Sequence, residues 1–87
     1  MPLLDDRPTV SALYRLQFEP AQNSWVLLYP EGMVKLNASA AEILKRCDGI
    51  ASVQELIEGL EREYAGVELR EDVCHFLSDA YGRGWIC

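Results

Sequence analysis

The chain has 87 residues, and its eight basic and fourteen acidic side chains give it a formal charge of −6. This length is enough for one domain with a modest core, because domains of this size bury only about 60% of the surface of the unfolded chain. The negative charge makes nucleic acid and anionic membranes poor partners, and no apolar run approaches the ~20 residues of a transmembrane helix.

The first thirteen residues contain two prolines, two aspartates and small polar residues without any period. This composition predicts an extended N-terminal arm, residues 1–13, that lies outside the core and whose removal leaves the fold intact. The start also lacks the basic and apolar stretches of a signal peptide, so we expect a cytoplasmic protein.

Three strands are predicted next. Apolar and polar side chains alternate over residues 14–19, which is typical of a strand with one buried face. Residues 25–29 are apolar on both faces, which predicts a central strand. A three-residue hairpin loop with a bulge, Pro30-Glu31-Gly32, is expected to lead into a short third strand, residues 33–36.

Three helices follow. Asn37 or Ser39 is expected to begin the first, and Gly49 to stop it. Ser52 and Glu55 form a capping box at the start of the second. The apolar positions at helical spacing are Ala40, Ile43, Leu44 and Cys47 in the first helix, Val53, Leu56, Ile57, Leu60 and Tyr64 in the second, and Leu69, Val73, Phe76, Leu77 and Ala80 in the third.

This order predicts an α+β fold, a small three-stranded antiparallel sheet followed by three helices, similar to a winged helix-turn-helix. A winged helix-turn-helix regulator that binds DNA or another protein is therefore the alternative function. Charge argues against DNA, because the second helix carries four glutamates against Arg62 and the third helix is also acidic on balance. No nucleic-acid partner is expected.

Residues suited to catalysis or metal binding are few. His75 is the only histidine, and the glutamates of the second helix are more simply a solvated face. Cys47, Cys74 and Cys87 are odd in number and far apart, so neither a disulfide framework nor a zinc site is indicated. We interpret Cys47 and Cys74 as core-side residues and Cys87 as a loose thiol. The sequence thus predicts no enzyme, no metal and no cofactor.

The third strand is the one feature that suggests binding. A strand at the end of a small sheet offers unpaired backbone groups to which an extended peptide can add. From the residues alone, the favoured interpretation is that the edge is simply short and protected by Lys35. The open edge and the arm also predict a possible homodimer at high concentration.

The run Leu27-Leu28-Tyr29-Pro30-Glu31-Gly32-Met33-Val34-Lys35-Leu36-Asn37, continued by residues 39–44 and 47–49, resembles the central signature of the PqqD family. Further matches extend the resemblance to about residues 14–86, which makes residues 14–87 a PqqD-like peptide-binding domain. The resemblance implies a peptide chaperone, or RiPP recognition element, of pyrroloquinoline quinone (PQQ) biosynthesis. Such a protein binds the precursor peptide PqqA and presents it to the radical SAM enzyme PqqE, which supplies the cofactors.

The resemblance also implies where the peptide binds, namely as a strand beside the third strand and against the third helix. A proline at Val34 is then expected to weaken binding by removing an N–H from the edge. The implied peptide-binding residues are Met33, Val34, Lys35 and Leu36 at the edge, with Arg70, Val73, Cys74, Leu77 and Tyr81 on the helix.

Overall fold

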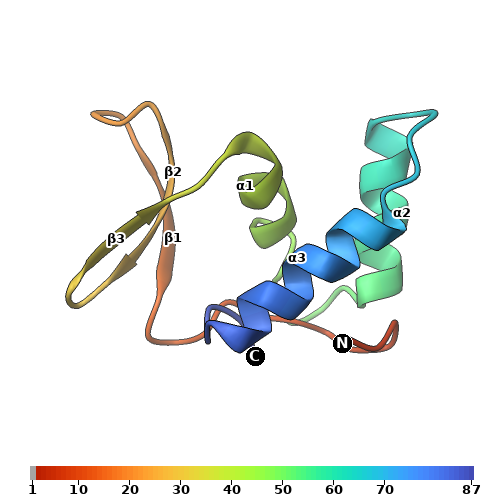
Figure 1. Ribbon diagram of the computed structural model, residues 1–87, viewed down its shortest axis with the longest axis horizontal. Coiled ribbons are helices and arrows are strands. Elements are labelled where there is room, and N and C mark those ends of the chain that lie inside the picture. Colours follow the sequence, from red (N-terminus) through yellow and green to blue (C-terminus); the bar gives the residue numbers. More distant parts are fainter. Residues whose placement is uncertain (1) are drawn as a thin grey trace.

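The computed structural model describes residues 2–87 and contains three strands followed by three helices (Figure 1). The sheet lies at one end of the molecule and all three helices lie to one side of it (Figure 1). This confirms the predicted α+β class and element order. The elements are β1 (Arg15–Glu19), β2 (Ser24–Tyr29), β3 (Gly32–Lys35), α1 (Ala38–Leu44), α2 (Val53–Glu63) and α3 (Arg70–Gly82).

The sheet is antiparallel with the order β1-β2-β3, so β2 is central as its two apolar faces predicted. Residues opposite each other on neighbouring strands share a face of the sheet. Leu16, Leu27 and Val34 form one such row, and all three pack in or against the hydrophobic core. We call this helix-covered side the inner face.

The connection between β2 and β3 is shorter than expected. Gly32 pairs with Tyr29 and already belongs to β3, which leaves Pro30 and Glu31 as a two-residue turn. The predicted three-residue loop with a bulge is therefore wrong, because Gly32 continues the ladder instead of forming part of the turn.

Local capping explains where α1 and α2 begin. The Asn37 side chain accepts a hydrogen bond from the Ala40 N–H at 2.8 Å, so Asn37 is the cap of α1. The predicted capping box of α2 is confirmed, with Ser52 accepting from the Glu55 N–H at 3.1 Å and Glu55 accepting from the Ser52 N–H at 2.9 Å. The predicted stop of α1 is wrong: the helix ends at Leu44, and Gly49 instead turns the chain beside the arm, with φ 78°.

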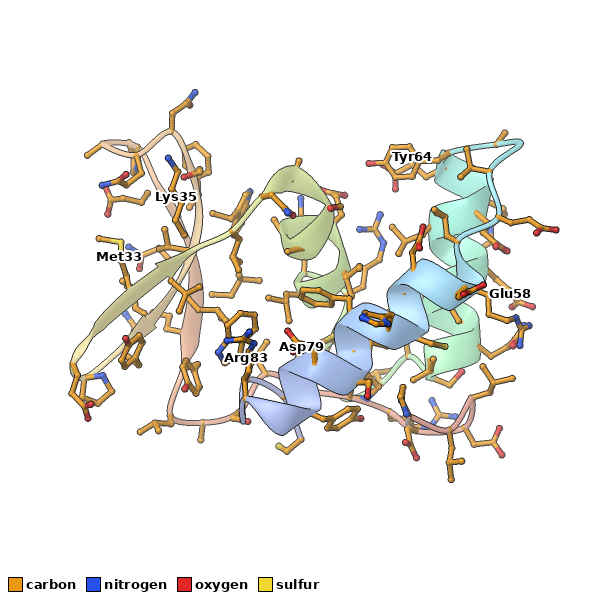
Figure 2. The ribbon with its side chains drawn as sticks, in the orientation of Figure 1. Met33, Lys35, Glu58, Tyr64, Asp79 and Arg83 are labelled. Carbon is orange, nitrogen blue, oxygen red and sulfur yellow. The ribbon has the colours of Figure 1, made fainter. Side chains whose placement is uncertain are left out.

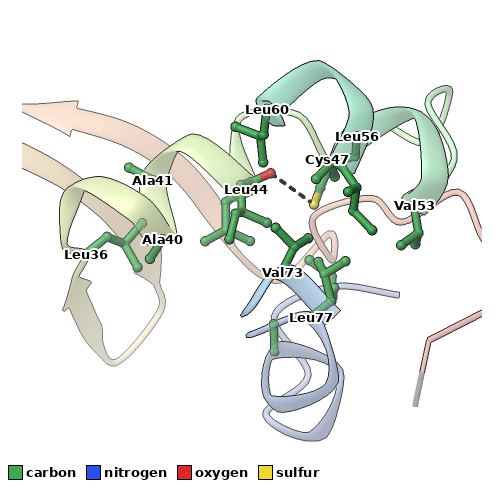
Figure 3. Packing of buried hydrophobic residues seen from close by; sticks show 14 of the residues in the cluster. Leu36, Ala40, Ala41, Leu44, Cys47, Val53, Leu56, Leu60, Val73 and Leu77 are labelled. Atoms are coloured by element: carbon green, nitrogen blue, oxygen red, sulfur yellow. Dashed lines mark hydrogen bonds between the residues drawn. The ribbon is translucent and has the colours of Figure 1, made fainter. Parts of the chain in front are cut away.

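The core lies between the inner face and the three helices (Figure 3). Leu27, Leu44 and Leu77 are at most 1% exposed. Cys47 is buried among them, where its thiol donates to the Ile43 carbonyl oxygen at 3.4 Å, and burial raises its pKa to about 12 (Figure 3). Cys47 is thus the core residue that the sequence predicted.

The arm is part of the folded structure. Pro8 is fully buried, and the carbonyl oxygens of Asp6 and Leu4 accept from the amides of Val53 and Gln54 at 2.8 and 3.0 Å. These are the first amides of α2, which a helix cannot satisfy internally. The expectation that the segment lies outside the core is therefore wrong, while the boundary at residue 14 remains a prediction.

The same segment also holds the C-terminal end in place. Thr9 and Cys87 exchange two backbone hydrogen bonds, of 3.1 and 2.9 Å, and Ser11 donates to the Trp85 carbonyl oxygen at 2.8 Å. The Gly49 amide donates to the Pro8 carbonyl oxygen at 2.9 Å. The arm thus ties the C-terminal tail to the turn after α1.

Candidate functional site: the β3 edge and α3

The β3 strand has an open edge, since it ends the sheet within the described residues 2–87. The Leu36 amide donates to the Trp25 carbonyl oxygen at 2.9 Å, which makes these two residues a hydrogen-bonded pair. Such pairs alternate along an antiparallel ladder, so Val34 bonds to β2 in the same way. The N–H and C=O groups of Met33 and Lys35 therefore point outward, and a bound strand would meet these groups.

The four predicted edge residues have different environments. Met33 is 46% exposed and Lys35 is exposed, whereas Val34 is half-buried against the core. Leu36 lies beyond the end of β3, is 6% exposed and belongs to the core. The Leu36 N–H already donates to the Trp25 carbonyl oxygen, so Leu36 contributes to an edge site by anchoring β3.

The five predicted residues of α3 do not share one face. Val73 and Leu77 are 2% and 0% exposed, so their side chains fill the core and do not line a surface groove. Tyr81 is half-buried on the arm side, where it lines a small pocket of about 210 Å³ with Pro2, Asp6 and Ser78, and burial is the main cause that raises its pKa.

Arg70 and Cys74 do line an open groove, of about 1380 Å³, along the outward side of α3. Arg70 also donates to the Gln54 side chain of α2 at 3.1 Å. We call this the acidic groove, because five carboxylates outnumber two guanidinium groups in its lining. The lining residues are Glu61, Glu68, Arg70, Glu71, Asp72, Cys74, His75, Ser78, Asp79, Gly82 and Arg83.

Phe76 and Asp79 of α3 and Arg83, which caps the C-terminal end of that helix, lie at helical spacing, and the sequence interpretation missed them as site residues. Asp79 and Arg83 also line the acidic groove. The Arg83 guanidinium lies 5.5 Å from the Trp85 ring and donates to Asp79 Oδ2 at 2.9 Å. The Phe76 ring is 6.5 Å from the same tryptophan ring. Arg83 sits at the end of α3 that is nearest to the sheet (Figure 2).

The signal for this side was the spacing of residues 76, 79 and 83, which places them on one helix face. The apolar stripe of Val73 and Leu77 fills the core and is therefore not available to a ligand. The outward backbone groups of β3 are suited to pairing with a bound strand, and the side chains of α3 are suited to contacting it. Within residues 2–87 there is no cluster of three histidine, cysteine or acidic side chains that could hold a metal ion.

Membrane insertion is a separate matter. In the part of the chain that the structure describes, no helix is both long enough and apolar enough to cross a bilayer.

Comparison with known proteins identifies the family. The sequence profile of coenzyme PQQ synthesis protein D (PqqD) matches residues 24–86. The chain belongs to the PqqD family. This confirms the resemblance that the sequence signature suggested.

Two curated relatives of the PqqD family illustrate the similarity, and both are named "PqqA binding protein". The relative from Pseudomonas paraeruginosa is 47% identical over 87 residues, which cover 99% of this chain and 95% of the relative. The relative from Acinetobacter baylyi is 44% identical over 86 residues, which cover 98% of this chain and 87% of the relative.

The fold of this PqqD family member also matches a solved structure, with a TM-score of 0.80 and 25% identity over 100% of this chain and 95% of the other. That structure is the solution NMR structure of the PqqD truncation of Methylobacterium extorquens PqqCD. It is described as a functional, stand-alone RiPP recognition element.

Proposed function

We propose that this protein binds the precursor peptide PqqA and presents it to the radical SAM enzyme PqqE in PQQ biosynthesis, without catalytic chemistry of its own. The observation that carries this proposal is the similarity over almost the entire chain to relatives named for PqqA binding. The open β3 edge supports it with a surface suited to an extended peptide.

The proposed binding mode is strand addition. The outward backbone groups of Met33 and Lys35 pair with the peptide and supply affinity that does not depend on its side chains. Alternate peptide side chains then point to the inner face, toward Val34 and the side of α3 that carries Phe76 and Arg83. Side-chain contacts on this inner side provide the selectivity.

The acidic groove extends the proposed site along α3. Its lining includes Arg70 and Cys74, two of the residues that the family resemblance implied, together with five carboxylates. A basic stretch of a bound peptide fits this groove best, because opposite charges steer association and fix register.

The geometry of an added strand supports presentation to PqqE. A peptide on the β3 edge keeps its other edge and one face exposed, so an enzyme can reach it while it is held. The iron–sulfur cluster and S-adenosylmethionine are then expected in the enzyme. A cytoplasmic location, the absence of a nucleic-acid partner and a possible homodimer remain predictions.

Calorimetric titration with synthetic PqqA tests the binding, and NMR of labelled protein locates it. We expect saturable binding with amide shifts in β3 and α3. No heat of binding, or shifts confined to α2, would contradict the proposal, and salt-sensitive retention of duplex DNA would favour the alternative regulator. Presentation is tested by following PqqA modification by PqqE, which we expect to depend on this protein.

A further inference from the structure

The face of the sheet that points away from the helices has its own composition. Cross-strand pairing places Arg15, Leu28 and Met33 in one row across the sheet. Gln17, Val26 and Lys35 form the next row on the same face. We call these six residues the outer face.

The outer face has an apolar centre that none of the helices covers. Val26 is 0% exposed, Leu28 is half-buried and Met33 is 46% exposed. Leu28 and Met33 are not part of the hydrophobic core cluster and do not pack against it. The helices all lie on the other side of the sheet, and Met33 points away from them (Figures 1 and 2). The exposed apolar surface of this face therefore comes from Met33 and the half-buried Leu28, next to the fully buried Val26. An exposed apolar surface marks an interaction site when polar residues surround it.

The two charged side chains of these rows are basic, although the next pair on this face, Glu19 and Ser24, adds one carboxylate and the chain carries −6 overall. Arg15 and Lys35 are both exposed and form no ion pair with any of residues 2–87. In the helical part, by contrast, Lys45 lies 2.6 Å from Glu42. Charge complementarity therefore favours a partner whose apolar contact surface is flanked by carboxylates.

The outer face would also be continuous with a peptide bound at β3. A strand added beside Met33 and Lys35 extends both rows by one residue, because opposite residues share a face. Half of the peptide side chains then face the core side, and the other half stand beside Met33 and Lys35. A partner on the outer face contacts the protein and the exposed half of the peptide together.

We propose that the outer face is the docking surface for the enzyme that modifies the bound peptide, through an apolar surface with flanking carboxylates on that enzyme. The inference rests on the proposed function and deepens it: the β3 edge and the inner face bind the peptide, and the outer face binds the enzyme that modifies it. A mixed row of this protein's residues and peptide residues would let the enzyme distinguish the loaded carrier from the empty one.

The test uses the variants Arg15→Glu and Leu28→Gln, which change the outer face without touching the outward groups of β3. Arg62→Glu is the matched control, because it makes the same charge change on exposed α2. Calorimetry measures PqqA affinity for each variant, and affinity for purified PqqE is measured with and without PqqA. Arg15 is exposed, so Arg15→Glu carries the test if Leu28→Gln unfolds.

We expect both outer-face variants to lower the PqqE affinity at least tenfold while PqqA affinity stays within twofold, and Arg62→Glu to change neither. Unchanged PqqE affinity in a folded Arg15→Glu variant would overturn the inference. A change in oligomeric state without a change in PqqE affinity would also overturn it, by showing that the face binds a second copy. Failure of the unaltered protein to bind PqqA would instead overturn the proposed function, and the PqqE titration without peptide keeps the two results separate.

Discussion

Val34 lies opposite Leu27 in the β2–β3 ladder as a hydrogen-bonded pair, so its N–H points into the sheet and not toward the open edge. This changes how the edge must be tested. The proline at Val34 that the sequence suggested would break the protein's own ladder, whereas a proline at Met33 removes an outward N–H.

We expect Met33→Pro to weaken PqqA binding tenfold or more, about 1.4 kcal/mol, and to leave the fold intact. Met33→Ala keeps the N–H and is expected to have little effect. Lys35→Ala should also be mild, because an exposed ion pair with the peptide is worth only about 0–1 kcal/mol.

Calorimetry measures the PqqA affinity of each variant, and the thermal unfolding midpoint shows whether the variant is folded. Val34→Pro should lower the midpoint, since it removes a ladder hydrogen bond. Normal peptide affinity in a folded Met33→Pro variant would show that the peptide does not pair with this edge.

Deleting residues 2–10 is expected to destabilise the protein. The deletion removes the buried Pro8 and the carbonyl partners of the Val53 and Gln54 amides. A loss of about 2 kcal/mol or more corresponds to a fall of roughly 8 °C or more in the unfolding midpoint. Arg7→Ala is the control: it removes the exposed ion pair with Glu55, which contributes little, and the hydrogen bond that Arg7 donates to the Ile50 carbonyl oxygen. A fall as large as that of the deletion would assign the stability to these Arg7 side-chain contacts instead.

Leu60→Ala is expected to cost roughly 2–5 kcal/mol in the free energy of unfolding, as a truncation within the core. Leu60 is 2% exposed on α2, whereas Tyr64 at the end of the same helix is 46% exposed. Tyr64→Ala should therefore cost much less. Denaturant titration of the pair measures the difference, and equal losses would contradict the register of α2.

The capping box makes stability depend on pH. The Ser52 N–H, and then the Ser52 hydroxyl, hold the pKa of Glu55 below its ordinary value of 4.5. The native carboxylate thus binds a proton less readily than the unfolded one, so its contribution is present above pH 4.5 and is lost as the pH falls.

Glu55→Gln keeps an acceptor in the capping box but cannot titrate. As the pH falls from about 5 to about 3, the thermal unfolding midpoint of the variant is expected to decline less steeply than that of the unaltered protein. Calorimetric scans across this range compare the two slopes. Parallel curves would mean that Glu55 does not contribute to the acid sensitivity.

Features encoded by neighbouring residues could be predicted from the sequence. Ser52 and Glu55 are three residues apart, so their reciprocal bonds follow from a local pattern. The central position of β2 followed from Val26 and Leu27, which are apolar on opposite faces and both buried.

Features that depend on distant backbone pairs could not be predicted. The arm is held through carbonyl groups such as that of Asp6, and its side chains show no period that could reveal this. Which residues of β3 bond to β2 and which point outward depends in the same way on the hydrogen bond that the Leu36 amide donates to the Trp25 carbonyl oxygen. Val73 and Leu77 of α3 differ from the prediction for another reason: both were assigned to the core and to the groove, and their side chains fill the core.

The pairing of Thr9 with Cys87 also has a kinetic consequence. It closes a loop that includes almost the entire chain, and closure of long loops carries an entropy cost that delays such contacts during folding. The arm is therefore expected to dock after the folding barrier has been crossed. Interactions that form late slow unfolding and leave the folding rate unchanged, so the arm determines how long the native state persists once it has formed.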